Sequence, residues 1–369
     1  MKKFENYAAT PNNPNWNYMI KRETPLYKRN NDLRDDFQRD YTRIIHSNSY
    51  RRLKHKTQVF FSPENDHICT RIEHVTHVES ISYTIAKYFG LNTDLTKAIS
   101  VAHDLGHSPF GHEGERILSE ISKRDLGKPF WHERNGLEFV DNIELLEDNN
   151  KNMQNLNLTY AVRDGIISHC GEIDENCIKP REEYINLDNY TYPNEFAPYT
   201  WEACVVKISD KISYICRDIE DAITLGILDE HVDELFELLN ITSENKQINN
   251  TIIINSLIHD LCENSSPENG LCFSKKALDL MNKIKEFNYK NIYSAEKIKP
   301  STRYFNLVIS EIYNLLKSTY SGINTLNKLK NRILFSLENE KDYYQAIIYY
   351  ITGMTDNFAI EIYNEIINF

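Results

Sequence analysis

The residues best suited to chemistry in this chain are two histidines and two aspartates. His103 and Asp104 are adjacent, His74 lies upstream of them, and Asp210 lies far downstream. Two imidazoles and two carboxylates can bind one divalent cation and still leave coordination positions open for water and a phosphate. The sequence therefore predicts one metal site, built from these four side chains.

A second group of ionisable residues follows the His-Asp pair closely. His112 and Glu115 lie one turn apart if this segment is helical, and a carboxylate so placed orients an imidazole and raises its basicity. We therefore predict that these two residues form an acid–base pair. His107 is either a further acid–base group or a core histidine, and His132 taken alone is more typical of a core histidine.

The helix predicted around Asp210 carries a third signal. Asp210, Tyr214 and Asp218 follow one another at intervals of four residues and so share one helix face. The opposite stripe is apolar and predicts the core contact; it contains Val205, Ile208, Ile212, Ile215, Ile219 and Ala222. The polar face alone is equally consistent with solvation, but together with the His-Asp pair it favours a face that lines a site.

Several signatures of nucleotide enzymes are missing from the sequence. It contains no glycine-rich P-loop, no G-x-S-x-G elbow and no dinucleotide-binding fingerprint. Their absence removes several common classes of nucleotide enzyme.

The composition is that of an ordinary globular protein. The chain has 369 residues, 41% hydrophobic and 26% charged, which suffices for one large domain or two smaller ones. No apolar run approaches the roughly 18 residues of a membrane span, and the polar N-terminus lacks a signal-peptide core. The seven scattered cysteines include no C-x-x-C pair and predict reduced thiols. We therefore expect a cytoplasmic protein without membrane contact.

Charge is unevenly distributed along the chain. The net charge is −12, yet residues 21–56 contain eleven Lys/Arg against five Asp/Glu. Such a segment is either a solvated basic face or a surface that binds a polyanion. Its position directly before the metal motifs favours the polyanion.

The elements that must position these residues are mostly helices. An amphipathic run over residues 74–89 ends at Gly90, which suits a helix C-terminal cap. Thr93 or Asp94 is predicted to cap the next helix, which leads to the His-Asp pair. A long helix is predicted over residues 201–225.

The rest of the chain is irregular or helical in pattern. Residues 145–160 predict a surface loop, and residues 171–200 an irregular stretch in which a short hairpin could form. Strand signals are few, so the predicted fold class is mainly α. We expect three parts: an N-terminal arm (1–30), a helical catalytic domain (31–230) and a C-terminal helical region packed on the core (231–369).

These motifs together resemble the HD-domain deoxynucleoside triphosphate triphosphohydrolases, the dGTPase-like family. The resemblance spans roughly residues 33–226. It rests on separated motifs in the right order: Ser49-Tyr50-Arg51-Arg52-Leu53-Lys54-His55-Lys56-Thr57-Gln58-Val59-Phe60, Arg71-Ile72-Glu73-His74, His103-Asp104-Leu105-Gly106-His107-Ser108-Pro109-Phe110-Gly111-His112, Trp131-His132-Glu133, Asp210-Lys211-Ile212-Ser213-Tyr214 and Asp218. It implies an HD-type helical core.

The resemblance also implies roles for the matching residues. The metal ligands fall on His74, His103, Asp104 and Asp210. The catalytic histidine and its acidic partner fall on His112 and Glu115, and a further active-site histidine on His132; His107 completes the predicted catalytic group. Gln58, Tyr214 and Asp218 match residues around the deoxyribose, and Arg71 and Lys211 match phosphate contacts. Lys211 beside a metal ligand would supply a cation for a triphosphate.

The implied activity is metal-dependent hydrolysis of a dNTP to a deoxynucleoside and tripolyphosphate. The expected cofactor is one divalent metal per active site, Mn²⁺ or Mg²⁺, with Fe, Co, Ni or Zn as alternatives. Two other functions stay open: an HD phosphohydrolase acting on another nucleotide, such as a monophosphate or an alarmone, and a non-catalytic regulator that binds nucleotide or nucleic acid. The resemblance further implies a homo-oligomer with an effector, which would be a second dNTP or single-stranded DNA.

Overall fold

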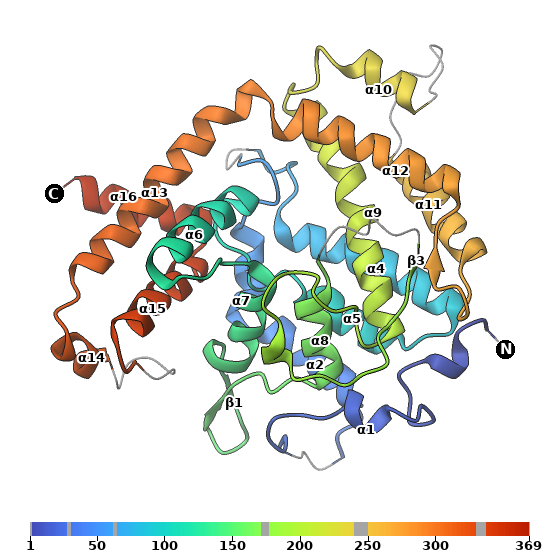
Figure 1. The fold of residues 1–369 in the computed structure, drawn as a ribbon, viewed down its shortest axis with the longest axis horizontal. Coiled ribbons are helices and arrows are strands. Elements are labelled where there is room, and N and C mark those ends of the chain that lie inside the picture. The colour runs from blue at the N-terminus through green and yellow to red at the C-terminus, as the bar shows by residue number, and fades with distance from the viewer. Residues whose placement is uncertain are drawn as a thin grey trace.

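Helices form most of the structure, as predicted for a mainly α protein (Figure 1). The computed structural model describes residues 2–27, 31–61, 65–170, 177–239, 250–329 and 337–368. Its helices are α1 (Trp16–Met19), α2 (Asp36–His46), α3 (Asn48–Arg52), α4 (Arg71–Phe89), α5 (Thr93–Ala102), α6 (Gly111–Leu126), α7 (His132–Glu138), α8 (Tyr160–Ser168), α9 (Trp201–Thr224), α10 (Val232–Leu238), α11 (Asn250–Asn264), α12 (Lys275–Asn288), α13 (Lys299–Ser318), α14 (Ile323–Leu329), α15 (Glu340–Thr352) and α16 (Asp356–Ile367). Its strands are β1 (Leu146–Glu147), β2 (Met153–Gln154), β3 (Cys177–Ile178) and β4 (Leu271–Cys272).

Three helices form the frame that holds the predicted site residues. α4 packs against both α5 and α9, and α5 also packs against α9. α4 carries His74, α5 ends directly before His103, and α9 carries Asp210. Because the three helices touch one another, residues that are far apart in the sequence meet at their junction.

The ends of α4 follow from local chemistry. At its start, the Glu73 carboxylate accepts a hydrogen bond from the backbone N–H of Thr70 at 2.8 Å. At its end, Gly90 has φ +83°, a left-handed conformation that glycine adopts at little cost. The predicted stop at Gly90 is confirmed.

The start of α5 differs slightly from prediction. The side chain of Asn92 accepts hydrogen bonds from the backbone N–H groups of Asp94 and Leu95, so Asn92 is the cap and the choice of Thr93 or Asp94 was wrong. A carboxamide at the residue before the first helical turn satisfies two otherwise unpaired donors. The predicted helix over 201–225 is confirmed as α9, which the Thr200 side chain caps.

Two short sheets also depart from prediction. Within the predicted loop 145–160, β1 and β2 pair antiparallel. β3 pairs with the distant β4 rather than in a local hairpin, and Cys177 forms a disulfide bond with Cys272; residues 171–176 lie outside the described residues. The prediction of reduced thiols was therefore wrong for these two cysteines. They are 95 residues apart in the sequence, so their spacing gave no sign of the pairing.

Much of the basic segment 21–56 is built into the fold. Arg22 forms an ion pair with buried Asp40 at 2.5 Å, and Arg43 donates hydrogen bonds to two backbone carbonyls. Three further cations pair with carboxylates: Arg34, Arg39 and Arg52. Among the described residues of this segment, the exposed cations are Lys21, which donates a hydrogen bond to the Tyr184 hydroxyl, Arg51 and Lys54. A count of basic residues could not distinguish internal pairing from a binding surface.

The C-terminal helices cover α6, the helix that follows the His-Asp segment. α13 and α15 pack against α6, and α13 also packs against α15 and α16; Figure 1 shows this group on the side of the molecule where the chain ends. The shared core includes Ile117, Leu118, Ile309, Tyr313 and Ile348. In the described part of the chain, no helix has the length and apolar character needed to cross a membrane.

Candidate metal centre and active site

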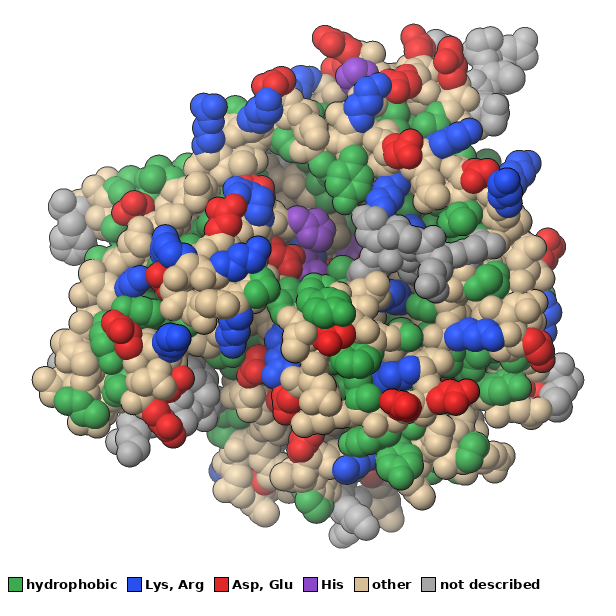
Figure 2. All heavy atoms as spheres, viewed as in Figure 1, with side chains coloured by type: hydrophobic (Ala, Val, Ile, Leu, Met, Phe, Trp, Pro, Cys, Tyr) green, Lys and Arg blue, Asp and Glu red, His purple; other side chains and the backbone are tan. Residues whose placement is uncertain are grey.

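A cavity of about 600 Å³ opens at the junction of α4, α5 and α9. In Figure 2, histidine side chains lie at the bottom of a hollow near the centre of the face shown. Every predicted site residue lines this cavity except His103 and Glu115, which contact residues that do. The opposite wall comes from the C-terminal region and includes Tyr289, Tyr293, Ile298, Ser301, Thr302 and Phe305.

The structure brings the four predicted metal ligands together. His74 Nε2 lies 2.9 Å from Asp210 Oδ1 and 3.9 Å from Asp104 Oδ2. His103 Nε2 lies 3.6 Å from Asp104 Oδ1 and 3.9 Å from Asp210 Oδ1. Ligand atoms of His74, His103 and Asp210 all lie within 4.8 Å of one another. Three separate helices or helix ends therefore converge on one point.

The hydrogen bonding of His103 suits a metal ligand. Its Nδ1 lies 2.6 Å from the Ser100 carbonyl oxygen, so this nitrogen carries the proton and donates. Its Nε2 is buried and has no hydrogen-bond partner among the described residues. An unpaired ring nitrogen beside two carboxylates fits a divalent cation, and the hydrogen bond to the Ser100 carbonyl fixes the orientation of the ring.

The electrostatics of the cluster favour charged carboxylates. Burial alone would raise the pKa of Asp104, but the imidazoles of His107 and His103 and the Arg71 guanidinium hold it well below its usual range. Burial also opposes the charge on Asp210, yet His74 lowers its pKa to about 2. Both aspartates are therefore negative at neutral pH, and a cation would neutralise them.

Glu115 lies between two histidines and hydrogen-bonds to one of them. Its carboxylate accepts from the backbone N–H of His132 at 2.9 Å and from His132 Nδ1 at 3.0 Å. His112 Nδ1 lies farther away, 3.7 Å from Glu115 Oε2. Burial would lower the pKa of His132, but Glu115 and Glu133 outweigh it and raise the pKa to about 9. His132 is therefore protonated at neutral pH.

His107 joins this histidine group to the aspartates. Its Nε2 lies 3.2 Å from Asp104 Oδ1, and its ring stacks on that of His132 with centroids 3.6 Å apart. Burial, Arg71 and His132 lower the pKa of His107 well below its usual value. Gly106 permits this close packing, because a Cβ at that position would lie 2.1 Å from the His132 carbonyl oxygen.

The residues predicted to face a deoxyribose form another part of the wall. Gln58, Tyr214 and Asp218 all line the cavity, and Gln58 Oε1 is buried without a hydrogen-bond partner among the described residues. Asp218 accepts a hydrogen bond from the hydroxyl of Tyr293. Burial raises the pKa of Asp218 to about 6.

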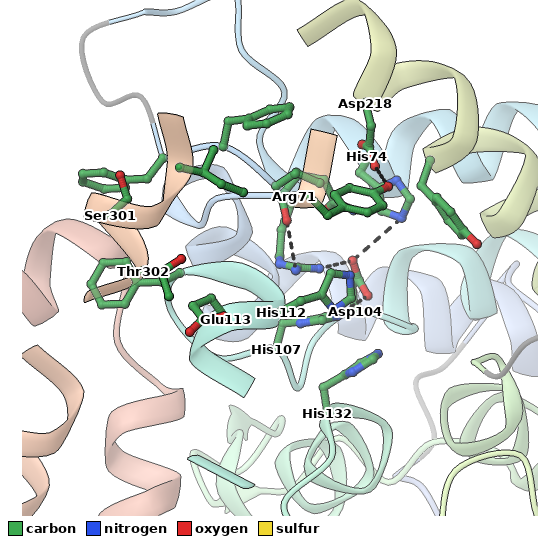
Figure 3. A pocket seen from close by; sticks show the side chains of 18 of the residues that line it. Arg71, His74, Asp104, His107, His112, Glu113, His132, Asp218, Ser301 and Thr302 are labelled. Carbon is green, nitrogen blue, oxygen red and sulfur yellow. Dashed lines mark hydrogen bonds and ion pairs between the residues drawn. The ribbon is translucent and has the colours of Figure 1, made fainter. Parts of the chain in front are cut away.

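The two predicted phosphate contacts have different surroundings. Arg71 is almost completely buried and donates to Asp104 Oδ2 at 2.8 Å; Figure 3 shows this contact at the inner end of the cavity. Lys211 follows Asp210 on α9 and also lines the cavity. The site therefore places cationic groups beside the carboxylates, as binding a polyphosphate requires.

The segment between His107 and His112 is held in a strained conformation. Phe110 has φ +62° and ψ +27°, a left-handed conformation that costs a non-glycine residue about 1–2 kcal/mol. Gly111 follows with φ +61°, and a Cβ there would lie 2.8 Å from the Gln58 carbonyl oxygen. These two residues turn the chain into α6, so that His112 and Glu115 lie near His132.

Among the cavity residues that were not predicted from the sequence, His169 and Tyr293 contact predicted site residues. His169, at the end of α8, lies with its Nε2 3.3 Å from His132 Nε2 and its ring 4.9 Å from that of His103. Tyr293 reaches Asp218 from the C-terminal region. A single histidine after an apolar helix and a tyrosine among many have no local signal. Only their packing reveals them.

Comparison with known proteins gives two family matches. The HD domain matches residues 71–215, which contain the four clustered ligands and the histidines around Glu115. The phosphohydrolase-associated domain matches residues 271–365, which form the opposite wall of the cavity and the helices that cover α6. The two matches thus meet at the cavity.

Similar proteins align along most of the chain. A deoxyguanosinetriphosphate triphosphohydrolase-like protein of Caldanaerobacter subterraneus subsp. tengcongensis is 35% identical over 91% of this chain and 86% of its own length. Proteins of the same description from Clostridium tetani and Rickettsia prowazekii are 33% and 32% identical over 91% and 94% of this chain, and over 86% and 94% of their own lengths. The clustered ligands, the HD match and these full-length similarities agree, and the chain belongs to the HD-domain family of dGTP triphosphohydrolase-like proteins.

Proposed function

We propose that this protein hydrolyses deoxynucleoside triphosphates to a deoxynucleoside and tripolyphosphate. The observation that supports this most is the position of the His74–His103–Asp104–Asp210 cluster at the inner end of a cavity that also contains Arg71 and Lys211. The carboxylates of the cluster would bind a metal ion, and the basic side chains of the same cavity would bind a polyphosphate. The names of the similar proteins point to the same substrate class.

The cluster would hold one divalent cation through His74, His103, Asp104 and Asp210, and we expect Mn²⁺ or Mg²⁺. When bound, this cation would supply positive charge next to the phosphates. Arg71 and Lys211 would bind the phosphate oxygens and stabilise the charge that develops on them as the bond to the 5′-oxygen breaks.

The histidines would manage the protons. Water attacks the α-phosphorus, the bond between that phosphorus and the 5′-oxygen breaks, and the 5′-oxygen must gain a proton. His112, the exposed member of the group, would exchange protons with the bound substrate. Glu115 would act on His112 and His132 together, since its carboxylate lies near both rings. His107 would orient Asp104 and His132 through its hydrogen bond and its stacking.

Selection of the sugar would depend on Gln58, Tyr214 and Asp218. The tyrosine ring would lie against the deoxyribose and exclude a 2′-hydroxyl by contact. Gln58 and Asp218 have polar atoms in or beside the cavity that a correctly placed sugar would pair with. Sites with buried polar groups reject ligands that leave them unpaired.

Product analysis tests this proposal. The protein is incubated with each dNTP and Mn²⁺ or Mg²⁺ in water labelled with ¹⁸O, and the products are identified by mass spectrometry. We expect a deoxynucleoside and tripolyphosphate, with the label in the tripolyphosphate, because attack occurs at phosphorus. Release of pyrophosphate or a monophosphate would favour an HD phosphohydrolase of another type. Tight binding without turnover would favour a regulator.

A further inference from the structure

Asp356 connects the C-terminal region to the loops of the active site. It is the first residue of α16 and is 4% exposed. Its Oδ2 accepts a hydrogen bond from the backbone N–H of Thr57 at 2.7 Å, and its Oδ1 accepts one from the backbone N–H of Phe110 at 2.9 Å. One buried carboxylate therefore joins two segments that are far apart in the sequence.

Both segments carry residues of the site. Thr57 precedes Gln58, and Phe110 stands two residues before His112. The segments also touch each other, since the Gln58 carbonyl leaves no room for a side chain at Gly111. A shift of either backbone would displace a residue that faces the cavity.

Lys56 forms a second connection of the same kind. Its buried ammonium donates hydrogen bonds to the carbonyl oxygens of His107 and Thr352. Thr352 ends α15, so this contact again links the C-terminal region to the segment that carries the histidines. Burial lowers the pKa of Lys56 well below its usual value and raises the pKa of Asp356, and attraction between the two groups partly offsets both shifts.

Aromatic packing supports the same segment from its other side. The ring of Phe305 on α13 stacks on the ring of Phe110, with centroids 4.3 Å apart and planes 4° apart. Phe110 is the residue with the left-handed backbone at the start of α6. Such a conformation persists only when its surroundings determine it. Here the Asp356 carboxylate fixes the backbone and Phe305 fixes the side chain.

We propose that Asp356 is a positioning residue of the active site: its carboxylate, with Lys56, holds the backbones at Thr57 and Phe110 so that Gln58 and His112 face the cavity correctly. The C-terminal region would then be part of the catalytic frame rather than an accessory cover. The effect on turnover rests on the proposed function, whereas the effect on the two backbones does not.

Asp356→Asn is the informative variant. The amide keeps one oxygen acceptor but presents an NH₂ group to the other backbone N–H, so one of the two hydrogen bonds is lost. Glu202→Gln is the control for loss of a buried carboxylate. Glu202 accepts from the backbone N–H groups of Ala9 and Asn92 at 2.9 and 2.8 Å, both on Oε1, so the amide removes the carboxylate but can keep both hydrogen bonds. Glu202 is not among the residues that line the cavity.

Two measurements on the full-length protein decide the matter. Hydrogen exchange by mass spectrometry reports the amides in peptides that contain Thr57 and Phe110, and steady-state kinetics with a dNTP reports kcat and KM. In the wild-type protein these amides should exchange slowly although they lie outside regular helices. Asp356→Asn should exchange faster there and lose roughly tenfold or more in kcat with little change in KM, since small misplacements of catalytic groups are costly. Glu202→Gln should keep kcat within about twofold.

Three results would overturn the proposal. The first is fast hydrogen exchange of the Thr57 and Phe110 amides in the wild-type protein. This result does not depend on any variant. The second is an Asp356→Asn protein with wild-type kcat. The third is an equal loss of kcat in Glu202→Gln, because it would show that replacing a buried carboxylate that does not line the cavity has the same effect. If the wild-type protein proves inactive on dNTPs, the exchange data alone still test the positioning, and only the proposed function fails.

Discussion

The Glu115 carboxylate bonds twice to His132, through the backbone nitrogen at 2.9 Å and through ring Nδ1 at 3.0 Å. The sequence predicted His112 as the partner of Glu115, and His112 Nδ1 lies 3.7 Å away. Glu115 is therefore placed to act on two histidines. In the proposed function these three residues would manage protons, while His74, His103, Asp104 and Asp210 would hold the metal.

The first prediction separates these two groups by mutation. His112→Ala should keep metal and nucleotide binding but lose on the order of 10²–10⁴ in kcat, the usual contribution of a general acid or base. Asp210→Ala should lose the metal itself, because it removes a charged member of the cluster. Calorimetry with Mn²⁺ and steady-state kinetics measure the two effects. Equal loss of metal in both variants would contradict the assignment of His112.

The second prediction concerns the sugar. The wild-type protein should hydrolyse a dNTP faster than the matching ribonucleotide, by on the order of 10²-fold, because in the proposed binding mode the Tyr214 ring would exclude a 2′-hydroxyl. Tyr214→Ala should reduce this preference, while Tyr88→Ala, an exposed tyrosine on α4, should keep it. The ratio of kcat/KM values for the two substrates provides the measurement. Similar rates for both substrates in the wild-type protein would refute the sugar-pocket assignment.

The third prediction is a dependence of stability on pH. Burial raises the pKa of Asp218 from 3.8 to about 6, so the folded protein binds this proton more tightly than the unfolded chain does. The folded state therefore loses stability as the pH rises through this window. Asn at position 218 carries no charge and avoids this loss.

The comparison is made by chemical unfolding of wild-type protein and Asp218→Asn at pH 5 and pH 7.5. Relative to wild type, the variant should gain about 1 kcal/mol in free energy of unfolding between the two pH values. Asp188→Asn, at an exposed aspartate, serves as the control and should show no comparable gain. A constant difference between Asp218→Asn and wild type at both pH values would show that Asp218 titrates normally.

The residues that the sequence identified are those whose type and spacing carry information. His103 and Asp104 are adjacent, and Asp210, Tyr214 and Asp218 share a helix face, so simple helix geometry relates them. The contacts of His169 and Asp356 depend instead on how separate helices pack. Nothing in the neighbouring sequence marks these residues. The Cys177–Cys272 bond was missed for the same reason.

The remaining predictions failed where several neighbouring residues were equally suited to the same structural role. Asn92, Thr93 and Asp94 are all good helix caps, and only the backbone conformation decides that Asn92 caps α5. Similarly, the positive charge of residues 21–56 was visible, but its pairing with Asp40 and with backbone carbonyls was not. The sequence shows which groups are present, and the fold decides which of them pair.

The last prediction concerns assembly and regulation. We expect a homo-oligomer, even-numbered, in which a second dNTP or single-stranded DNA binds near a subunit contact and raises activity. Because the described cations of segment 21–56 are mostly paired internally, the exposed Arg51 and Lys54 are the best candidates to contact this second polyanion. The double variant Arg51→Gln/Lys54→Gln should respond less to the added ligand while its basal activity is unchanged. A matched pair on the C-terminal helices, Lys275→Gln/Lys276→Gln, should respond like wild type. Light scattering gives the oligomer, and activity with and without each addition gives the response. A monomer with hyperbolic kinetics and no response to either ligand would exclude this regulation and leave the catalytic assignments intact.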